Sequence, residues 1–470
     1  MLFNSFIFLI FAAVFFLFWG SVKGKPNLRY IYIIVFSFAF YMYATPWWIL
    51  LLIGTALLDY LAGLGMLHFP DKKKLFMALS LTANLGLLFY FKYQFFVGTN
   101  LNALFQSFGT NWEIPVKQLA LPIGISFYTF QSMSYTIAAY RGALTPTKNI
   151  LHFYAYVSLW PQLVAGPIEK AVELLPQLEH PKDATKDDIW EGLNLIVRGY
   201  FKKMVIADNL APSVNAVYNA PEIAHSMPLW WVASIMFAIQ IYCDFSGYTD
   251  IARGFAQMMG FKFMLNFDHP YGAVSVTEFW RKWHISLSTW FRDYVYIPLG
   301  GNRKGEWHGI RNMWITMLVS GIWHGAAWTF VIWGALHAFY TTVERKTHWP
   351  AKLQNIKGGR TLSAGIVFFL VVIAWVFFRA NTLPQALSVV GIMLNPTALS
   401  FGPVIELGLP SLFFFGLGML MILNHFFGWS RQLHANSPLL TKYRPISIAV
   451  IAMLCIFWRG PGNAFIYFQF

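Results

Sequence analysis

An imidazole lies in the middle of an apolar stretch that is long enough to cross a bilayer. His324 belongs to the sequence SGIWHGAAWTF, within the stretch 313–340. A side chain that titrates near neutral pH is costly in hydrocarbon, so it either bonds a neighbouring helix or lines a functional cavity. Gly321 and Gly325 flank it, and glycine lets another backbone or a substrate approach the ring. This pattern favours a functional role for His324.

A second imidazole, His337, follows thirteen residues later. One continuous helix would place it about 140° around the axis from His324. The two rings would then face different surroundings unless the helix breaks between them. We expect His337 to have a structural or supporting role.

A third histidine lies in the aromatic and basic segment EFWRKWHISLSTWFRDY, at 278–294. His284 and Ser288 are four residues apart and would share one helix face. Arg281 and Arg292 are natural anchors for an anionic ligand such as a phosphate. The structural alternative is an interfacial helix whose basic and aromatic side chains reach the headgroups. The density of Trp, Arg and His favours function.

Two aspartates occur in the apolar segment IYCDFSGYTDIARG, at 241–254. Asp244 and Asp250 are six residues apart, so they do not share one narrow helix face. A packing cluster with nearby Arg or Lys is the main expectation for Asp250. Asp244 is kept as a candidate for the site.

Signatures of several enzyme classes are absent from the sequence. It contains no GxxxxGK[ST] phosphate loop, no HExxH zinc helix and no GxSxG nucleophile elbow. Cys243 and Cys455 indicate neither a disulfide framework nor a CxxC site. We expect no bound metal. Residue chemistry alone leaves an enzyme, a transporter and a channel open.

The elements that must hold these side chains are membrane helices. The chain has 470 residues, of which 57% are hydrophobic and 11% charged, and its mean hydropathy is +0.51. Soluble proteins carry about 25% charged residues. The net charge of +14 does not indicate nucleic-acid binding, because the basic residues fall in short loops typical of the cytoplasmic side. The composition predicts an all-α polytopic membrane protein.

Twelve apolar segments are candidate spans, since about 20 residues cross a ~30 Å hydrocarbon core. They are 2–19, 29–44, 46–67, 76–96, 119–140, 150–166, 229–255, 313–341, 361–379, 384–395, 410–428 and 445–459. Segments 158–167 and 279–301 are interrupted by Pro, Gly or charge, so we expect re-entrant or interfacial helices around a cavity.

The polar segments indicate an orientation. Basic loops at 23–29 and 70–74 predict an N-terminus outside the cytoplasm. Segment 179–208 predicts a loop followed by an amphipathic helix on the cytoplasmic surface. No second domain is visible, and we expect 1–470 to form one membrane domain.

Several blocks resemble the membrane-bound O-acyltransferase (MBOAT) family. They are LPIGISFYTFQSMSY (121–135), WPQLVAGPI (160–168), GYFKKMVIAD (199–208), YCDFSGYTDIARG (242–254), the block 266–303, and RNMWITMLVSGIWHGAAWTF (311–330). The resemblance covers about 121–340. It is greatest for the alginate O-acetyltransferase (AlgI) branch, with peptidoglycan O-acetylases and the teichoic-acid D-alanyl transfer protein DltB as relatives.

The resemblance implies about eleven transmembrane helices with re-entrant helices between them. Funnels from both membrane faces would meet at the catalytic histidine, which is His324 of the WHG motif. His284, which lies 40 residues earlier, fills the place of the family's second polar residue. His324 would act as a general base or accept the acetyl group transiently. His284 would orient that ring or polarise the thioester carbonyl.

The resemblance also implies acetyl-CoA, or another acyl thioester, as the donor, with no permanently bound cofactor. Residues expected to contact the donor are Arg281, Lys282, Ser288, Arg292, Arg303, Asp244 and Trp323.

The implied setting is the bacterial inner membrane. Expected partners are membrane lipid, a polysaccharide acceptor, and a separate periplasmic acetyl acceptor protein of the SGNH or AlgX/AlgJ-like type. Alginate, acetylated cellulose, another exopolysaccharide and peptidoglycan stay open as acceptors, and D-alanylation of teichoic acid is less favoured. The alternatives from other classes are a polysaccharide or lipid-intermediate transporter and a non-catalytic scaffold.

Overall fold

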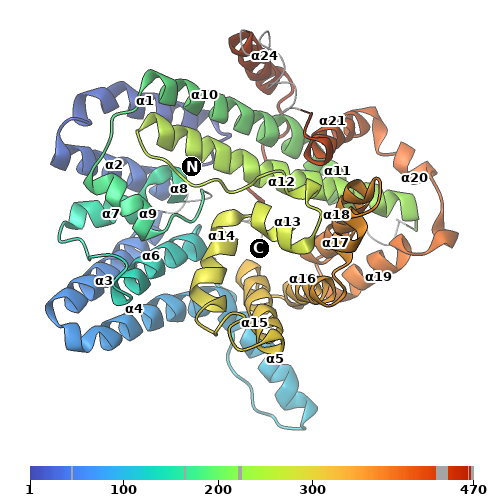
Figure 1. Cartoon of the computed structure of the whole chain (residues 1–470), viewed down its shortest axis with the longest axis horizontal. Coiled ribbons are helices and arrows are strands. Elements are labelled where there is room, and N and C mark those ends of the chain that lie inside the picture. Colours follow the sequence, from blue (N-terminus) through green and yellow to red (C-terminus); the bar gives the residue numbers. More distant parts are fainter. Residues whose placement is uncertain (44–45, 164–165, 221–224, 430–442, 464, 467–470) are drawn as a thin grey trace. The chain divides into compact units, whose positions relative to one another are not determined.

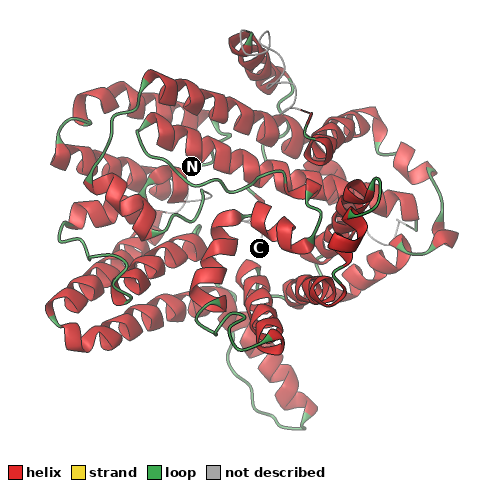
Figure 2. Ribbon diagram, in the orientation of Figure 1, coloured by secondary structure: helices red, strands yellow, loops and turns green. Residues whose placement is uncertain are grey.

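The computed structural model describes residues 1–43, 46–163, 166–220, 225–429, 443–463 and 465–466 (Figure 1). This part of the chain consists of helices and loops and contains no strand (Figure 2). The expected all-α fold is therefore confirmed for the described residues.

The chain forms two compact units. One comprises Met1–Ile196 and Ile251–Met264, and the other comprises Val197–Asp250 and Leu265–Phe470. Helices α10 (Lys186–Tyr200) and α12 (Met227–Met258) contribute residues to both. The expectation of one membrane domain stays a prediction.

The other helices of the first unit are α1 to α9. Their bounds are α1 (Phe6–Val22), α2 (Pro26–Met42), α3 (Ile49–His68), α4 (Lys73–Leu88), α5 (Gln94–Ser107), α6 (Ile125–Tyr140), α7 (Ile150–Ser158), α8 (Trp160–Leu163) and α9 (Ala171–Glu179). A buried carboxylate links three of them, because Asp59 of α3 accepts hydrogen bonds from Ser80 and Asn84 of α4 and from Ser132 of α6.

The second unit holds the histidines of interest. Its helices are α11 (Asp208–Asn219), α13 (Val276–Lys282), α14 (Ile285–Phe291), α15 (Glu306–His324), α16 (Trp328–Thr347), α17 (Trp349–Gln354), α18 (Gly359–Arg379), α19 (Leu383–Met393), α20 (Gly402–Ile405), α21 (Gly408–Phe427) and α24 (Arg444–Phe457). Two π-helices, η4 (Phe201–Ala207) and η7 (Arg292–Tyr296), interrupt its helical segments.

Five helical stretches of the described chain are long and apolar enough to cross a membrane. They are Pro46–His68, Pro70–Ser107, Met227–Met258, Gly359–Arg379 and Gly408–Phe427. Each overlaps a segment that the sequence predicts to span. Segments 2–19, 384–395 and 445–459 overlap shorter apolar helices. The count of about eleven spans stays a prediction.

The interrupted segments are broken, as expected. Helix α7 ends at Ser158, and α8 has only four residues, Trp160–Leu163. Segment 279–301 is divided among α13, α14 and η7. The expected amphipathic helix forms α10, where Thr185 and Asp188 hydrogen-bond reciprocally at its start.

The prediction of one helix over 313–341 is wrong. Helix α15 ends at His324, and α16 begins at Trp328. Gly325 and Ala327 have extended backbones, so the chain turns between the two helices. The 140° separation assumed for His324 and His337 therefore does not apply.

Candidate active site

Helices α15 and α16 form a tight antiparallel hairpin with His324 at its turn. A Cβ atom on Gly321 would lie 2.3 Å from the carbonyl oxygen of Phe330, and one on Gly334 would lie 2.5 Å from that of Met317. Only glycine allows so close an approach of two helix backbones. The hairpin places His324 where the chain reverses direction.

His324 lies in an aromatic cage and is 4% exposed. Its ring centroid is 4.9 Å from that of Trp333, 5.0 Å from Trp323 and 5.3 Å from Phe378. Trp333 also lies 4.8 Å from His337. One indole ring therefore contacts both imidazoles, which the broken helix makes possible.

His284 lies at the junction of α13 and α14 and is fully buried. Its φ of 42° and ψ of 55° are left-handed, which is uncommon for a residue other than glycine. Such conformations persist where the surrounding structure enforces them, often at functional sites. Burial lowers the pKa of His284 to about 3, so its imidazole is neutral at physiological pH.

Asn266 determines which nitrogen of His284 carries the proton. Asn266 Oδ1 accepts hydrogen bonds from the backbone N–H and the hydroxyl of Ser286, so this atom is the amide oxygen. It lies 3.2 Å from His284 Nδ1. Ser286 Oγ also lies 3.4 Å from Nδ1, but its hydroxyl makes the shorter contact with Asn266. Because an amide oxygen only accepts, the contact with Asn266 favours the tautomer with the proton on Nδ1 and the lone pair on Nε2. In this tautomer His284 accepts a proton or a hydrogen bond at Nε2.

Trp323 connects the two histidines that the sequence singles out. Its ring centroid is 6.4 Å from His284 and 5.0 Å from His324. Phe245 of α12 packs edge-on against His284 at 4.6 Å. Residues of α12, of the α13–α14 junction and of α15 thus meet in one aromatic cluster that contains both imidazoles.

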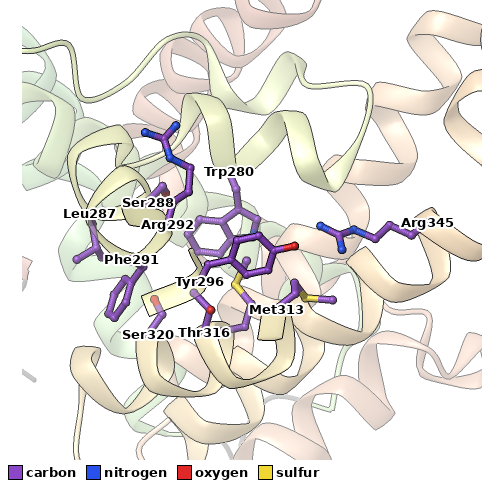
Figure 3. A pocket seen from close by; sticks show the side chains of 11 residues that line it. Trp280, Leu287, Ser288, Phe291, Arg292, Tyr296, Met313, Thr316, Ser320 and Arg345 are labelled. Carbon is purple, nitrogen blue, oxygen red and sulfur yellow. The ribbon is translucent and has the colours of Figure 1, made fainter. Parts of the chain in front are cut away.

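A pocket of about 160 Å³ lies beside this cluster (Figure 3). It is lined by Trp280, Leu287, Ser288, Phe291, Arg292, Tyr296, Met313, Thr316, Met317, Ser320 and Arg345. Arg292 and Arg345 lie on opposite sides of the Trp280 and Tyr296 rings in this view. Ser320 is one helical turn before His324 on α15. The pocket thus combines apolar walls with two guanidinium groups.

The structure brings only some of the expected donor contacts to this pocket. Ser288 and Arg292 line it, whereas Arg281 and Arg303 are exposed and not among its lining residues. Lys282 forms an ion pair with Glu278 at 2.7 Å. The donor roles of all these residues stay predictions.

Asp244 lies in a buried ionic cluster away from the pocket lining. Its Oδ1 is 2.6 Å from Lys203 Nζ, which also lies 2.8 Å from Asp208. Its other oxygen accepts the backbone N–H of Ile466 at 2.7 Å. These contacts give Asp244 a role in holding the C-terminal segment.

Sequence reasoning missed Asn266, Trp333 and Arg345. Asn266 lies 18 residues before His284, and this separation matches no known motif or helix face. Arg345 follows the apolar part of α16, where a basic residue is typical of any helix end. Trp333 becomes notable only once the chain turns after His324.

These observations describe a buried aromatic cluster with two imidazoles beside a pocket, and comparison with known proteins gives the class of the protein. Residues 129–383 match the model of the MBOAT, membrane-bound O-acyltransferase family. The chain belongs to this family, and it is a multi-pass membrane acyltransferase. No group of three metal-ligating His, Cys, Asp or Glu side chains occurs in the described part of the chain.

Individual relatives are similar over most of the chain. The probable alginate O-acetylase AlgI of Pseudomonas putida is 39% identical over 406 residues, which is 84% of this chain and 80% of that protein. The protein of the same name from Pseudomonas aeruginosa is 39% identical over 392 residues, or 82% and 72%. The peptidoglycan O-acetyltransferase of Helicobacter pylori is 34% identical over 393 residues, or 78% and 73%.

Proposed function

We propose that the protein moves an acetyl group from cytoplasmic acetyl-CoA across the bacterial inner membrane for O-acetylation of an extracytoplasmic polysaccharide. The observation that carries this proposal is the placement of His324. It lies buried at the turn of the α15–α16 hairpin, and Trp323 joins its ring to His284. Two fixed imidazoles beside a pocket suit proton transfer during acyl transfer.

The chemistry needs one base and one leaving group. His324 takes the proton of the acceptor hydroxyl while that oxygen attacks the thioester carbonyl carbon. A new carbon–oxygen bond forms, the carbon–sulfur bond breaks, and the proton passes to the departing thiolate. The products are the acetyl ester and free CoA thiol. General base catalysis of this kind contributes roughly 10²–10⁴-fold.

His284 supports this reaction as an acceptor. With its proton on Nδ1, its Nε2 lone pair orients an N–H or O–H group. Polarising the thioester carbonyl would require a hydrogen-bond donor at that position. The neutral imidazole held by Asn266 has none at Nε2, so the orienting role is favoured over the polarising one.

The pocket of Figure 3 suits the donor. Its apolar wall fits the acyl-thioester end of the donor, and Arg292 and Arg345 add positive charge to the pocket. We therefore assign the thioester end of acetyl-CoA to this pocket.

The acceptor is proposed from the relatives. Two of them are named as probable alginate O-acetylases, so alginate or a similar exopolysaccharide is the favoured polymer. Peptidoglycan is the second candidate, because the Helicobacter pylori relative is a peptidoglycan O-acetyltransferase. A periplasmic acceptor protein of the SGNH or AlgX/AlgJ-like type would carry the acetyl group to the polymer.

One substitution tests the core of this proposal. His324→Ala should abolish polymer O-acetylation in cells, because no other group replaces the base. His308→Ala is the matched control, since His308 is an exposed imidazole on the same helix. Wild-type acetylation in His324→Ala, at normal expression, would contradict the proposal.

Thiol release separates the enzyme from a transporter. Purified wild-type protein with its acceptor should release free CoA thiol from acetyl-CoA. A transporter for a polysaccharide or lipid intermediate would move substrate without consuming the thioester.

A further inference from the structure

The proposed reaction requires hydrogen-bond donors that the two assigned histidines do not supply. Negative charge develops on the thioester carbonyl oxygen as the acceptor attacks. Donors fixed near that oxygen stabilise the transition state in a site that excludes water. His324 is occupied as the base, and His284 presents a lone pair at Nε2.

Three side chains at and around Trp333, which lies next to His324, carry ring nitrogens that lack a hydrogen-bond partner among the described residues. Both ring nitrogens of His337 and the indole nitrogens of Trp280 and Trp333 have no hydrogen-bond partner among the described residues. His337 is 0% and Trp333 1% exposed. An indole N–H can only donate, and a buried donor without an acceptor costs free energy.

These three side chains form one cluster that extends from the catalytic ring to the pocket. The Trp333 centroid lies 4.9 Å from His324, 4.8 Å from His337 and 5.6 Å from Trp280. Trp280 and His337 are 4.9 Å apart. Trp280 also lines the donor pocket. The indole N–H groups of Trp280 and Trp333 therefore lie between the pocket assigned to the thioester and His324, the proposed base.

We propose that Trp333 and Trp280, together with His337, form the hydrogen-bond donor set for the carbonyl oxygen of the acyl thioester. The inference rests on the proposed function and names a binding subsite within it. The indole N–H groups donate to the developing oxyanion. His337 packs against both indoles and adds the N–H of its neutral ring. The acetyl thioester supplies the acceptor that these nitrogens lack within the protein.

Substitutions by phenylalanine test the donor set, because they keep an aromatic ring and remove the N–H. Trp333→Phe and Trp280→Phe should each lower kcat, and the loss of one such donor typically costs about 10²–10³-fold. The KM for acetyl-CoA should change far less, because the bond strengthens in the transition state. His337→Gln, which keeps a donor, should retain more activity than His337→Phe.

Trp375→Phe is the matched control. Trp375 is another buried indole without a partner for its N–H among the described residues, and it packs 6.0 Å from Trp333. It has no ring contact with either His324 or His337 among those described. Its substitution should leave kcat within a few-fold. Equal losses for Trp375→Phe and Trp333→Phe would assign the effect to packing and overturn the proposal.

A spectroscopic readout covers variants whose activity is too low to interpret. In His324→Ala protein, the ¹³C-labelled carbonyl stretch of bound acetyl-CoA should lie at lower frequency than in the His324→Ala, Trp333→Phe double variant. Identical frequencies would overturn the proposal. Wild-type protein that releases no thiol from acetyl-CoA would instead contradict the proposed function, and this inference with it. Wild-type turnover that persists in the Phe variants would contradict this inference alone.

Discussion

The proton on His284 is fixed by a residue without any acid–base chemistry of its own. Asn266 Oδ1 accepts the backbone N–H of Ser286, which identifies it as the amide oxygen. The same oxygen faces His284 Nδ1 as a hydrogen-bond acceptor. A change at position 266 should therefore alter the chemistry of His284 without touching its ring. This separates the electrostatic role of Asn266 from a packing role.

Asn266→Asp should shift the pH dependence of the reaction. A carboxylate at this position keeps the acceptor and stabilises the imidazolium form, so the pKa of His284 rises from its low value of about 3. The neutral ring is the active form and exists above that pKa, so the acid limb of the kcat profile should move to higher pH. An adjacent opposite charge shifts a pKa by about 1–3 units.

The control is Ser286→Ala, which removes one hydroxyl donor to Asn266 but adds no charge. Its kcat profile against pH should overlay that of the wild type. An unchanged acid limb in folded Asn266→Asp protein would show that the His284 protonation state does not limit the reaction. His284 itself could be predicted from its sequence context, whereas Asn266 could not, because folding brings it there across 18 residues.

At the scale of an element, the sequence predicts a helix from the 3.6-residue repeat of its apolar positions. The prediction of which side chains are buried fails where that repeat is interrupted. Lys202 and Lys203 belong to a segment expected to be an amphipathic surface helix. However, the π-helix η4 (Phe201–Ala207) changes the phase of that segment, and Lys203 is only 1% exposed. A π-helix has a different residue repeat from an α-helix, so a 3.6-residue pattern loses its register there. The turn after His324 likewise makes the single-helix repeat over 313–341 invalid, because the chain reverses direction there.

Lys203→Met should destabilise the protein strongly. Lys203 is the cationic partner of Asp208 and Asp244, and it donates to the carbonyl oxygen of Asn463 at 3.0 Å. Removing the cation leaves two carboxylates buried at 1–3% exposure, and breaking a buried ion pair costs about 3–5 kcal/mol. The melting temperature in detergent measures this loss.

Two further variants make this result specific. Lys346→Met removes an ion pair with Glu306 that is largely exposed, so it should cost about 0–1 kcal/mol. Neutralising both aspartates in Lys203→Met, as Asp208→Asn and Asp244→Asn, should recover much of the lost stability. A Lys203→Met protein as stable as Lys346→Met would contradict the assignment of a charged cluster.

At the scale of the whole molecule, composition predicts the class and leaves the topology open. High hydropathy and few charges indicate a polytopic membrane protein, which family membership confirms. The number of spans does not follow, because several apolar segments form helices too short or too broken to count by length. Within the second unit, the α15–α16 hairpin does determine one feature of the topology. The start of α15 and the end of α16 lie at the same end of the helix pair. Trp314 donates to Thr342 at 3.0 Å, and Lys346 pairs with Glu306 at 2.9 Å.

Cysteine labelling should therefore place the flanks of the hairpin on one side of the membrane. In a Cys243→Ser, Cys455→Ser background, single cysteines at Lys304 and Lys352 should both react from the cytoplasm, because basic residues flank the hairpin and favour that side. Lys72→Cys is the reference for the cytoplasmic side, because its loop is basic. Thr110→Cys is the reference for the outer side, because its loop is nearly uncharged. If 313–341 crossed the membrane as one helix, the two flanks would label from opposite sides. That outcome would contradict the hairpin and, with it, the contact of both imidazoles with Trp333.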